Sequence, residues 1–187
     1  PAKAAMLDDQ SRFAYVPPDR ILGLLDIPEN GSMLDFGTGT GTYAIEIAQK
    51  RPDIQVLAYD EQPAMLQLLA AKLRGPAVPN VTLLDAADCQ AYGARVDRVL
   101  ALNVLHELGD DAVRRLLSFL KPGGFALIVD WNADVERPVG PPHDHVYTTS
   151  DAFRRLGSFA PDVAVVAKFP YHYALRAGLA SPARSLP

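Results

Sequence analysis

Short apolar runs alternate with amphipathic stretches over most of the chain. The apolar runs predict strands at residues 32–36, 54–59, 81–84, 96–103 and 125–131. Between them, apolar positions that recur every three or four residues predict helices at 41–51, 64–74 and 111–120. Strands that alternate with helices are typical of an α/β domain, in which helices cover both faces of a mostly parallel sheet.

The later part of the chain has a different pattern. A proline-rich stretch at 137–142 predicts a loop, and a short helix is expected at 151–156, with Ser150 as its cap. Two apolar stretches, 163–169 and 171–177, predict the last strands. They should form an antiparallel hairpin, because a parallel pair would need a long crossover between them.

The two ends of the chain fit the alternation less well. Prolines interrupt the first 30 residues around a short predicted helix at 19–25. We therefore expect residues 1–30 to form an arm or lid, residues 31–177 to form the folded domain, and residues 178–187 to form a tail. The length of the chain suits one such domain.

Composition narrows the class of protein. Lysine and arginine number 18 and the acids 22, so the net charge is 18 − 22 = −4. This balance gives no electrostatic signature of a nucleic-acid or anionic-membrane partner. The lone cysteine, Cys89, excludes an intrachain disulfide, and a cytoplasmic location is expected. No apolar run approaches the roughly 18 residues of a membrane-spanning helix, and the start of the chain does not resemble a signal peptide.

The strongest chemical signal is the segment Asp-Phe-Gly-Thr-Gly-Thr-Gly at 35–41, which follows the first predicted strand and opens a helix. Glycine lets the backbone turn sharply and approach a ligand closely. The dinucleotide fingerprint G-x-G-x-x-G would need a third glycine at position 42, which is Thr42 here. Asp35 adds a carboxylate, which would repel a pyrophosphate. An NAD(P) oxidoreductase is therefore the less favoured alternative.

This segment resembles the first motif of the class I methyltransferases that use S-adenosylmethionine (SAM), and four further similarities follow in order. Residues 59–66 resemble the end of the second strand in that family, where an acid binds the SAM ribose. Asp85-Ala86 resembles the pair that contacts adenine. Residues 96–107 resemble the fourth-strand motif, and residues 120–124 resemble the turn before strand five. Within the family, the ubiquinone/menaquinone C-methyltransferases and their relatives are the most similar group.

The resemblance implies a Rossmann-like three-layer αβα sandwich with a mostly parallel seven-stranded sheet and an antiparallel last strand. It also implies SAM as the cofactor and S-adenosylhomocysteine as the product. The residues expected to bind SAM are Asp35, Gly37, Thr38, Gly39, Gly41, Asp60, Glu61, Met65, Asp85, Ala86 and Asn103.

Three of these residues have a structural alternative. Asp60 can accept hydrogen bonds from two ribose hydroxyls, or it can cap the helix near Pro63. Asp88 lies one helical turn from Asp85 and could take its role. Met65 could lie against adenine or simply fill the core.

Methyl transfer needs alignment of the reactants, and it needs a base only when the acceptor must lose a proton. His106, after the fourth strand, is the candidate base, and Trp131, at the end of the fifth, could stack on a planar acceptor. The alternatives are a histidine bonded to the structure and a packing tryptophan. His143 and His145 are two residues apart, but no third ligand lies within sequence reach, so no metal site is expected.

The sequence thus favours a SAM-dependent methyltransferase that acts on a small-molecule acceptor, with no nucleic-acid or membrane partner. A non-catalytic SAM-binding module, which would keep the glycines and Asp60 but lack a closed acceptor pocket, is a further alternative. Residue patterns do not distinguish O-, N- and C-methylation, and oligomeric state is not indicated.

Overall fold

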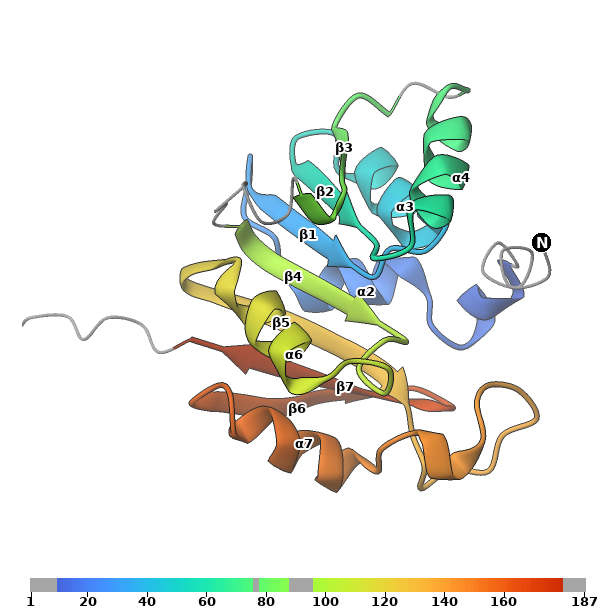
Figure 1. Ribbon diagram of the computed structural model, residues 1–187, viewed down its shortest axis with the longest axis vertical. Coiled ribbons are helices and arrows are strands. Elements are labelled where there is room, and N and C mark those ends of the chain that lie inside the picture. Colours follow the sequence, from blue (N-terminus) through green and yellow to red (C-terminus); the bar gives the residue numbers. More distant parts are fainter. Residues whose placement is uncertain (1–9, 76–77, 88–95, 180–187) are drawn as a thin grey trace, which may run out of the picture. The chain divides into compact units, whose positions relative to one another are not determined.

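The computed structural model describes residues 10–75, 78–87 and 96–179 (Figure 1). The chain divides into two compact units, residues 1–94 and residues 95–187. The predictions that lie outside the described residues concern Asp88, Cys89 and the two ends, 1–9 and 180–187.

The first unit builds three parallel strands and the helices beside them. Its elements are η1 (Gln10–Ala14), α2 (Pro18–Leu25), β1 (Ser32–Phe36), α3 (Thr42–Lys50), β2 (Gln55–Tyr59), α4 (Pro63–Leu73) and β3 (Val81–Leu84). The strand order is β3-β2-β1, and both pairs are parallel. Helix α3 packs on β2 and β3, and α2 packs on α3. Four of the five residues of β1 and of β2 are buried, as expected for strands covered on both faces.

The described part of the predicted arm packs on helix α3. The ring of Phe13 meets the ring of Tyr43 edge-on at 5.4 Å between centroids. The Tyr43 hydroxyl donates to the Val16 carbonyl at 2.8 Å, and Val16 is buried. These contacts fasten residues 13–16 beside the start of the helix that follows the glycine segment.

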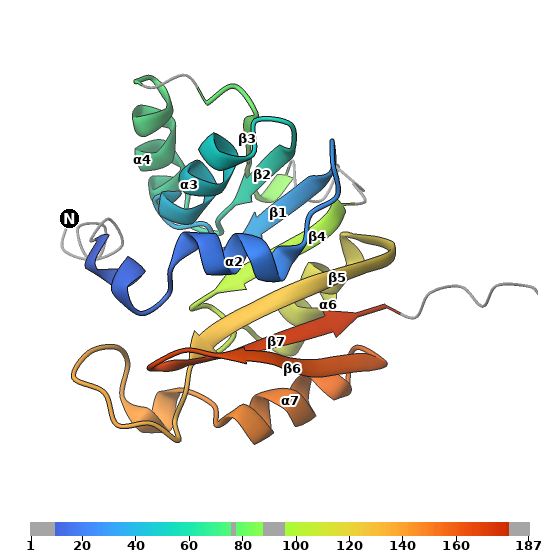
Figure 2. The same ribbon diagram turned by 180° about the vertical axis from the view of Figure 1, so that it is seen from behind.

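The second unit ends in an antiparallel hairpin. Its elements are β4 (Val96–Leu102), α6 (Asp110–Ser118), β5 (Leu120–Trp131), η2 (His143–His145), α7 (Thr149–Gly157), β6 (Asp162–Lys168) and β7 (His172–Gly178). Strands β4 and β5 are parallel, whereas β7 is antiparallel to both β5 and β6. This confirms the predicted hairpin. Helix α6 packs on β5 and α7 on β6 and β7; α6 lies in front of these strands in Figure 1 and behind them in Figure 2.

The strands of both units belong to one seven-stranded sheet of order β3-β2-β1-β4-β5-β7-β6. This confirms the predicted Rossmann-like α/β class, with a mostly parallel seven-stranded sheet and an antiparallel last strand. Strands β1, β2 and β3 lie side by side with their carboxyl ends at one edge. That edge is where ligands bind in open α/β sheets.

The predicted end of the helix at 111–120 is wrong. Helix α6 ends at Ser118, and Leu120 already belongs to β5, because it pairs with Val96 at the start of β4. The residues from Lys121 to Gly124 fall within the bounds of β5, but the register shifts between the Val96–Leu120 and Arg98–Phe125 pairs. Gly123 has φ 79°, so the turn predicted there is present as an irregularity between the two paired positions.

The predicted cap of helix α7 is also wrong. The helix begins at Thr149, and its N-cap is Thr148 rather than Ser150. The Thr148 hydroxyl accepts the Asp151 N–H at 3.0 Å. A threonine therefore makes the capping bond two residues earlier than predicted.

Candidate active site

The glycine segment forms a tight turn on the end of β2. The N–H groups of Gly37 and Thr38 both donate to the Tyr59 carbonyl, at 2.8 and 2.9 Å. Gly37 has φ 81° and Gly39 has φ 57°, in the left-handed region that side chains disfavour. The backbone shape of the turn therefore favours glycine at these positions even without a ligand.

Gly41 has a packing role as well. Its φ is 79°, and a Cβ atom there would lie 2.2 Å from Cδ1 of Leu69, a fully buried residue of α4. Glycine at 41 therefore lets α4 approach the turn. From the same helix, the Lys72 ammonium donates to the Thr40 carbonyl at 2.8 Å.

Asp60, directly after β2, joins the glycine turn to the start of α4. Its Oδ2 accepts the Gly39 N–H at 2.8 Å, and its Oδ1 accepts the Gln62 N–H at 2.9 Å. Gln62 is the N-cap residue of α4 and makes no side-chain cap bond, so Asp60 binds the N–H just before the helix and does not cap it. Each carboxylate oxygen has a second lone pair. The Asp60 carboxylate therefore has capacity for further hydrogen-bond donors.

Asp35 is a buried acid beneath the same turn. Its side chain is 3% exposed, and its Oδ2 accepts the Thr38 hydroxyl at 2.8 Å. Burial raises the pKa of Asp35 to about 7, against the opposing effect of the Thr38 bond, and the nearby Asp60 carboxylate adds to the rise. A cation bound beside Asp35 would lower this pKa, since it favours the charged carboxylate.

The remaining predicted cofactor residues of the first unit follow the strands of the same edge. Glu61 is exposed after β2, and Met65 of α4 is buried. Asp85 directly follows β3, and Asp85 and Ala86 are both exposed. The first unit thus brings the turn, Asp60 and Asp85 to one sheet edge.

Asn103 follows β4 in the second unit and has an unusual backbone. Its φ is 58°, in the left-handed region that asparagine tolerates better than most residues. Its N–H continues the sheet by donating to the Val129 carbonyl at 2.8 Å. Its Oδ1 is buried and has no hydrogen-bond partner within the described part of the chain. A buried acceptor of this kind suits a ligand donor, because leaving it unmatched costs stability.

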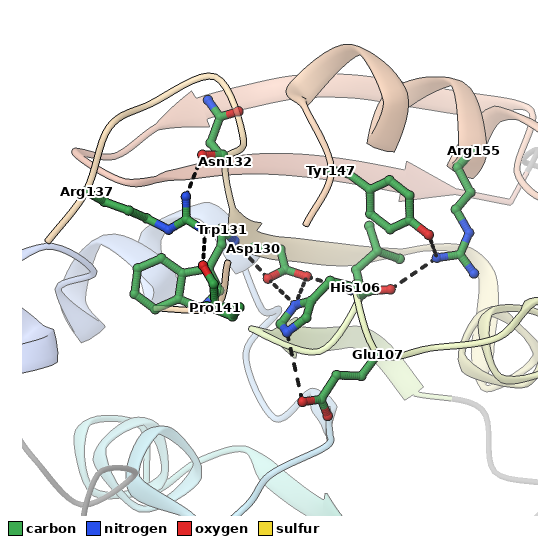
Figure 3. A network of polar contacts seen from close by, with 10 residues as sticks. His106, Glu107, Asp130, Trp131, Asn132, Arg137, Pro141, Tyr147 and Arg155 are labelled. Carbon is green, nitrogen blue, oxygen red and sulfur yellow. Dashed lines mark hydrogen bonds and ion pairs between the residues drawn. The ribbon is translucent and has the colours of Figure 1, made fainter. Parts of the chain in front are cut away.

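His106 and Asp130 form a hydrogen-bonded pair (Figure 3). The Asp130 side chain is fully buried in β5, and its carboxylate lies 2.9 and 3.0 Å from Nδ1 of His106. It also accepts the backbone N–H groups of His106 and Trp131, at 2.9 and 2.8 Å. A carboxylate that only accepts hydrogen bonds fixes Nδ1 of a neutral ring as the donor, which would place the ring's lone pair on Nε2. In the same view Nε2 faces Glu107, whose Oε1 lies 3.9 Å away.

The Trp131 side chain is buried and packs against neighbouring residues. Its ring lies 4.1 Å from the His172 ring between centroids, at 34°. A Cβ on Gly140 would meet the indole at 3.0 Å, so the loop backbone lies against the ring. The Arg137 guanidinium is 5.6 Å from the ring centroid. This surrounding favours the packing alternative over stacking on an acceptor.

The histidines of the 143–145 segment are exposed, and Nδ1 of His143 lies 3.1 Å from the Ala133 carbonyl oxygen. Among the residues that the structure describes, no group of three or more histidine, cysteine or acidic side chains could hold a metal ion.

The sequence did not assign a role to Asp130, at the end of the fifth predicted strand. Its position at the end of an apolar strand could have indicated a functional acid. Its partner His106, 24 residues away, could not be predicted from the sequence. Arg155 of α7, which binds the turn around His106, was not singled out, because helix patterning shows only that it lies off the apolar face.

Comparison with known proteins agrees with this geometry. Residues 33–124 match a family model described as a methyltransferase domain. A SAM-dependent methyltransferase from Aquifex aeolicus has a similar crystal structure, with a TM-score of 0.82 and 26% identity, over 94% of this chain and 96% of that chain.

Two curated relatives match over part of their length. Methyltransferase str2 of Strobilurus tenacellus is 31% identical over 111 residues, which are 57% of this chain and 38% of the relative. A ubiquinone/menaquinone biosynthesis C-methyltransferase of Geobacter sulfurreducens is 28% identical over 115 residues, 58% of this chain and 45% of the relative. The chain therefore spans less than half the length of these two relatives.

Proposed function

We propose, from the premise that this chain belongs to the class I SAM-dependent methyltransferase family, that it transfers the methyl group of SAM to a small-molecule acceptor. The observation that carries the proposal is the way Asp60 joins the glycine turn to α4, which leaves acceptor capacity on the carboxylate at the ligand-binding edge of the sheet. The comparisons do not favour the oxidoreductase alternative.

The residues present fit SAM. The cofactor carries two vicinal ribose hydroxyls, which suit the Asp60 carboxylate, and a cationic amino group, which suits the buried acid Asp35. In the second unit, Asn103 stays a predicted SAM-binding residue, and its Oδ1 has no hydrogen-bond partner among the described residues. We assign Gly37, Thr38, Gly39 and Gly41 to close backbone approach, and Glu61, Met65, Asp85 and Ala86 to the ribose and adenine.

SAM supplies a methyl group that is already electrophilic because it is bonded to a positively charged sulfur. The chain's own task is then to orient the acceptor and, where necessary, to take its proton. We propose that Nε2 of His106 takes that proton, while Asp130 holds the ring in the required tautomer and stabilises the imidazolium that forms. Trp131 would shape the pocket through its packing.

We infer that the acceptor is a small molecule rather than a nucleic acid. The net charge of −4 supports this, since phosphate backbones bind to basic surfaces. None of the helices within the described ranges is long and apolar enough to cross a membrane. The single cysteine supports a cytoplasmic location as part of the proposal.

We also propose that residues 1–30 act as a lid for the acceptor. The contact of Phe13 and Val16 with Tyr43, beside the glycine turn, supports this placement. Deletion of residues 1–16 should impair acceptor turnover more than binding of S-adenosylhomocysteine. Equal loss of both would contradict the lid.

Calorimetry tests the cofactor assignment. The protein should bind SAM and S-adenosylhomocysteine and should not bind NAD⁺. Gly39→Val should abolish binding, because valine is strained at φ 57° and would occupy the approach path. Asp19→Ala, which removes an exposed acid that pairs with Lys50, is the control. NAD⁺ binding without SAM binding would contradict the assignment.

A turnover screen tests the enzymatic function. The wild-type protein is incubated with SAM and a panel of phenols, carboxylic acids, amines and quinols, and release of S-adenosylhomocysteine is measured. Turnover of one class identifies the acceptor chemistry. Tight cofactor binding without turnover of any class would instead support the non-catalytic SAM-binding module.

A further inference from the structure

Two neighbouring arginines of helix α7 have different surroundings. The side chain of Arg154 is 74% exposed and pairs with Asp151 of the same helix, with 2.8 Å between Nη1 and Oδ1. The side chain of Arg155 is 15% exposed, and its guanidinium points toward the turn after β4 (Figure 3). Arg154 has an ordinary surface role, whereas Arg155 belongs to the interior of the second unit.

Arg155 binds backbone carbonyls from a distant part of the chain. Its Nη2 donates to the Leu108 carbonyl at 2.6 Å, and its Nη1 donates to the Leu105 carbonyl at 3.1 Å. Nη1 also donates to the Tyr147 hydroxyl at 3.0 Å. The acidic partner, Asp110, is farther away at 3.3 Å and is 63% exposed. The guanidinium is therefore held mainly by neutral acceptors.

The two carbonyls lie on either side of His106 in the sequence. Within this turn, Glu107 N–H donates to the Val104 carbonyl at 2.9 Å, and Leu108 N–H donates to the Leu105 carbonyl at 3.2 Å. Asp130 holds His106 from strand β5, through the backbone N–H and ring Nδ1. Arg155 holds the same turn from helix α7. His106 is thus held by Asp130 from strand β5, and the turn that carries it is held by Arg155 from helix α7.

The chemistry of the guanidinium suits this task. A buried cation is unfavourable unless its N–H groups find acceptors, and here two of those acceptors are carbonyls of the turn that carries His106. The guanidinium is planar and presents its donors in a fixed fork, so it can bridge two carbonyls, whereas an ammonium group is a point donor. A simple surface ion pair explains neither the burial nor the choice of partners.

We propose that Arg155 is a positioning residue, which fixes the turn at 103–109 so that the His106 ring keeps Nδ1 on Asp130 and Nε2 toward Glu107. The catalytic consequence rests on the proposed role of His106 as the base. Arg155 itself takes no part in proton transfer.

The experiment compares Arg155→Met, Arg155→Lys and the control Arg154→Met from the same helix. Nitrogen-15 NMR of the imidazole rings reports the tautomer of His106, with the signal assigned through His106→Gln. The wild type and Arg154→Met should show neutral His106 with the proton on Nδ1. Arg155→Met should show a mixture of tautomers, and Arg155→Lys should lie between them, because lysine cannot bridge both carbonyls.

Kinetics with an acceptor found by the screen gives the second readout. Arg155→Met should lower kcat by roughly 10- to 100-fold, the scale of a misplaced catalytic group. The KM for SAM should change much less than kcat, because Asn103 is the only proposed SAM-binding residue outside the first unit. Arg154→Met should match the wild type in both constants. If Arg155→Met does not fold, Arg155→Lys carries the test, with a smaller fall in kcat in the same direction.

The outcomes separate this inference from the proposed function. If Arg155→Met keeps the wild-type tautomer and kcat, and only the melting temperature falls, Arg155 is purely structural and the inference is wrong. If the tautomer changes but His106→Gln leaves kcat unaltered, the positioning role stands and the proposed base is wrong.

Discussion

Two buried carboxylates, Asp35 in the first unit and Asp130 in the second, have opposite surroundings. Asp130 accepts hydrogen bonds from two backbone N–H groups and one imidazole N–H. Asp35 accepts one hydroxyl hydrogen bond among the described residues, and its burial raises its pKa to about 7. Three N–H groups hold Asp130, whereas the effect of burial on the pKa of Asp35 is opposed by the Thr38 hydroxyl and the charge of Arg12. We infer that Asp130 serves a fixed histidine and that Asp35 is completed by a cationic ligand.

Asp130→Asn should produce the largest effect, because an amide cannot accept from the imidazole and both N–H groups as the carboxylate does. We expect kcat for the screened acceptor to fall by roughly 10²- to 10⁴-fold, the range for loss of acid–base catalysis. The calorimetric affinity for S-adenosylhomocysteine should change little. Asp144→Asn, at an exposed position, is the control. An unaltered kcat would remove the distinction between the two carboxylates.

Asp35 should make the ligand-free protein less stable as pH rises. The pKa of Asp35 is about 7 in the folded state against an ordinary value of 3.8, so the folded state binds more protons than the unfolded state between these values. The free energy of unfolding should therefore fall from about pH 4 to about pH 7, by up to about 4 kcal/mol at 1.36 kcal/mol per unit. Denaturation of wild type and Asp35→Asn across this range measures it.

The asparagine variant should flatten that part of the profile, since it does not ionise. SAM binding to the wild type at pH 6 should release up to about one proton, measured by calorimetry in buffers of different ionisation enthalpy. Asp35→Asn should bind SAM more weakly and release none. A wild-type profile as flat as that of the variant would mean that Asp35 carries no unfavourable charge.

Asp60→Ala tests the surroundings of Asp35, because the Asp60 carboxylate contributes to the raised pKa of Asp35. The substitution should weaken SAM binding by roughly 1.5–3 kcal/mol, the scale of hydrogen bonds to a charged group. It should also lower the midpoint of the stability transition assigned to Asp35. Unchanged binding by a folded variant would leave Asp60 as only a link between the turn and α4.

Tyr173→Phe should have the smallest effect and tests the neighbourhood of Asp130. Tyr173 pairs with Asp130 across β7 and β5, is fully buried, and its hydroxyl has no hydrogen-bond partner within the described residues. Burial holds the pKa of this phenol far above its usual range. Loss of the hydroxyl should change stability by less than about 1 kcal/mol. A larger loss in thermal unfolding would mean that the hydroxyl supports Asp130.

Local chemistry could be predicted well from the sequence. The bounds of β1 at Ser32–Phe36 and of β3 at Val81–Leu84 follow from apolar runs that end in turn residues, and the antiparallel hairpin follows from its short connection. The glycine turn and the adjoining acid Asp60 were predicted as one ligand edge, and they are hydrogen-bonded to each other. These features depend on residues near one another or on strand ends that parallel pairing must bring together.

Features that depend on distant partners could not be predicted. Leu120 continues the apolar stripe of α6, and only its pairing with Val96 shows that it belongs to β5. The Nδ1 contact between His106 and Asp130 joins two element ends whose side chains could each have faced elsewhere. Every residue has a backbone carbonyl, so the sequence could not predict that Arg155 donates hydrogen bonds to the carbonyls of Leu105 and Leu108.

The contact between Gly140 and the Trp131 indole limits how the loop at 137–147 can be re-engineered. Gly140 has φ 99°, and a Cβ there would lie 3.0–3.1 Å from three indole atoms, so a side chain would be strained in two ways. A library that diversifies this loop to accept new substrates should keep position 140 as glycine and vary the exposed positions on either side. Loop grafts from other proteins should be chosen to bring their own small residue to this point. Any replacement loop must therefore fit against the Trp131 indole at this position.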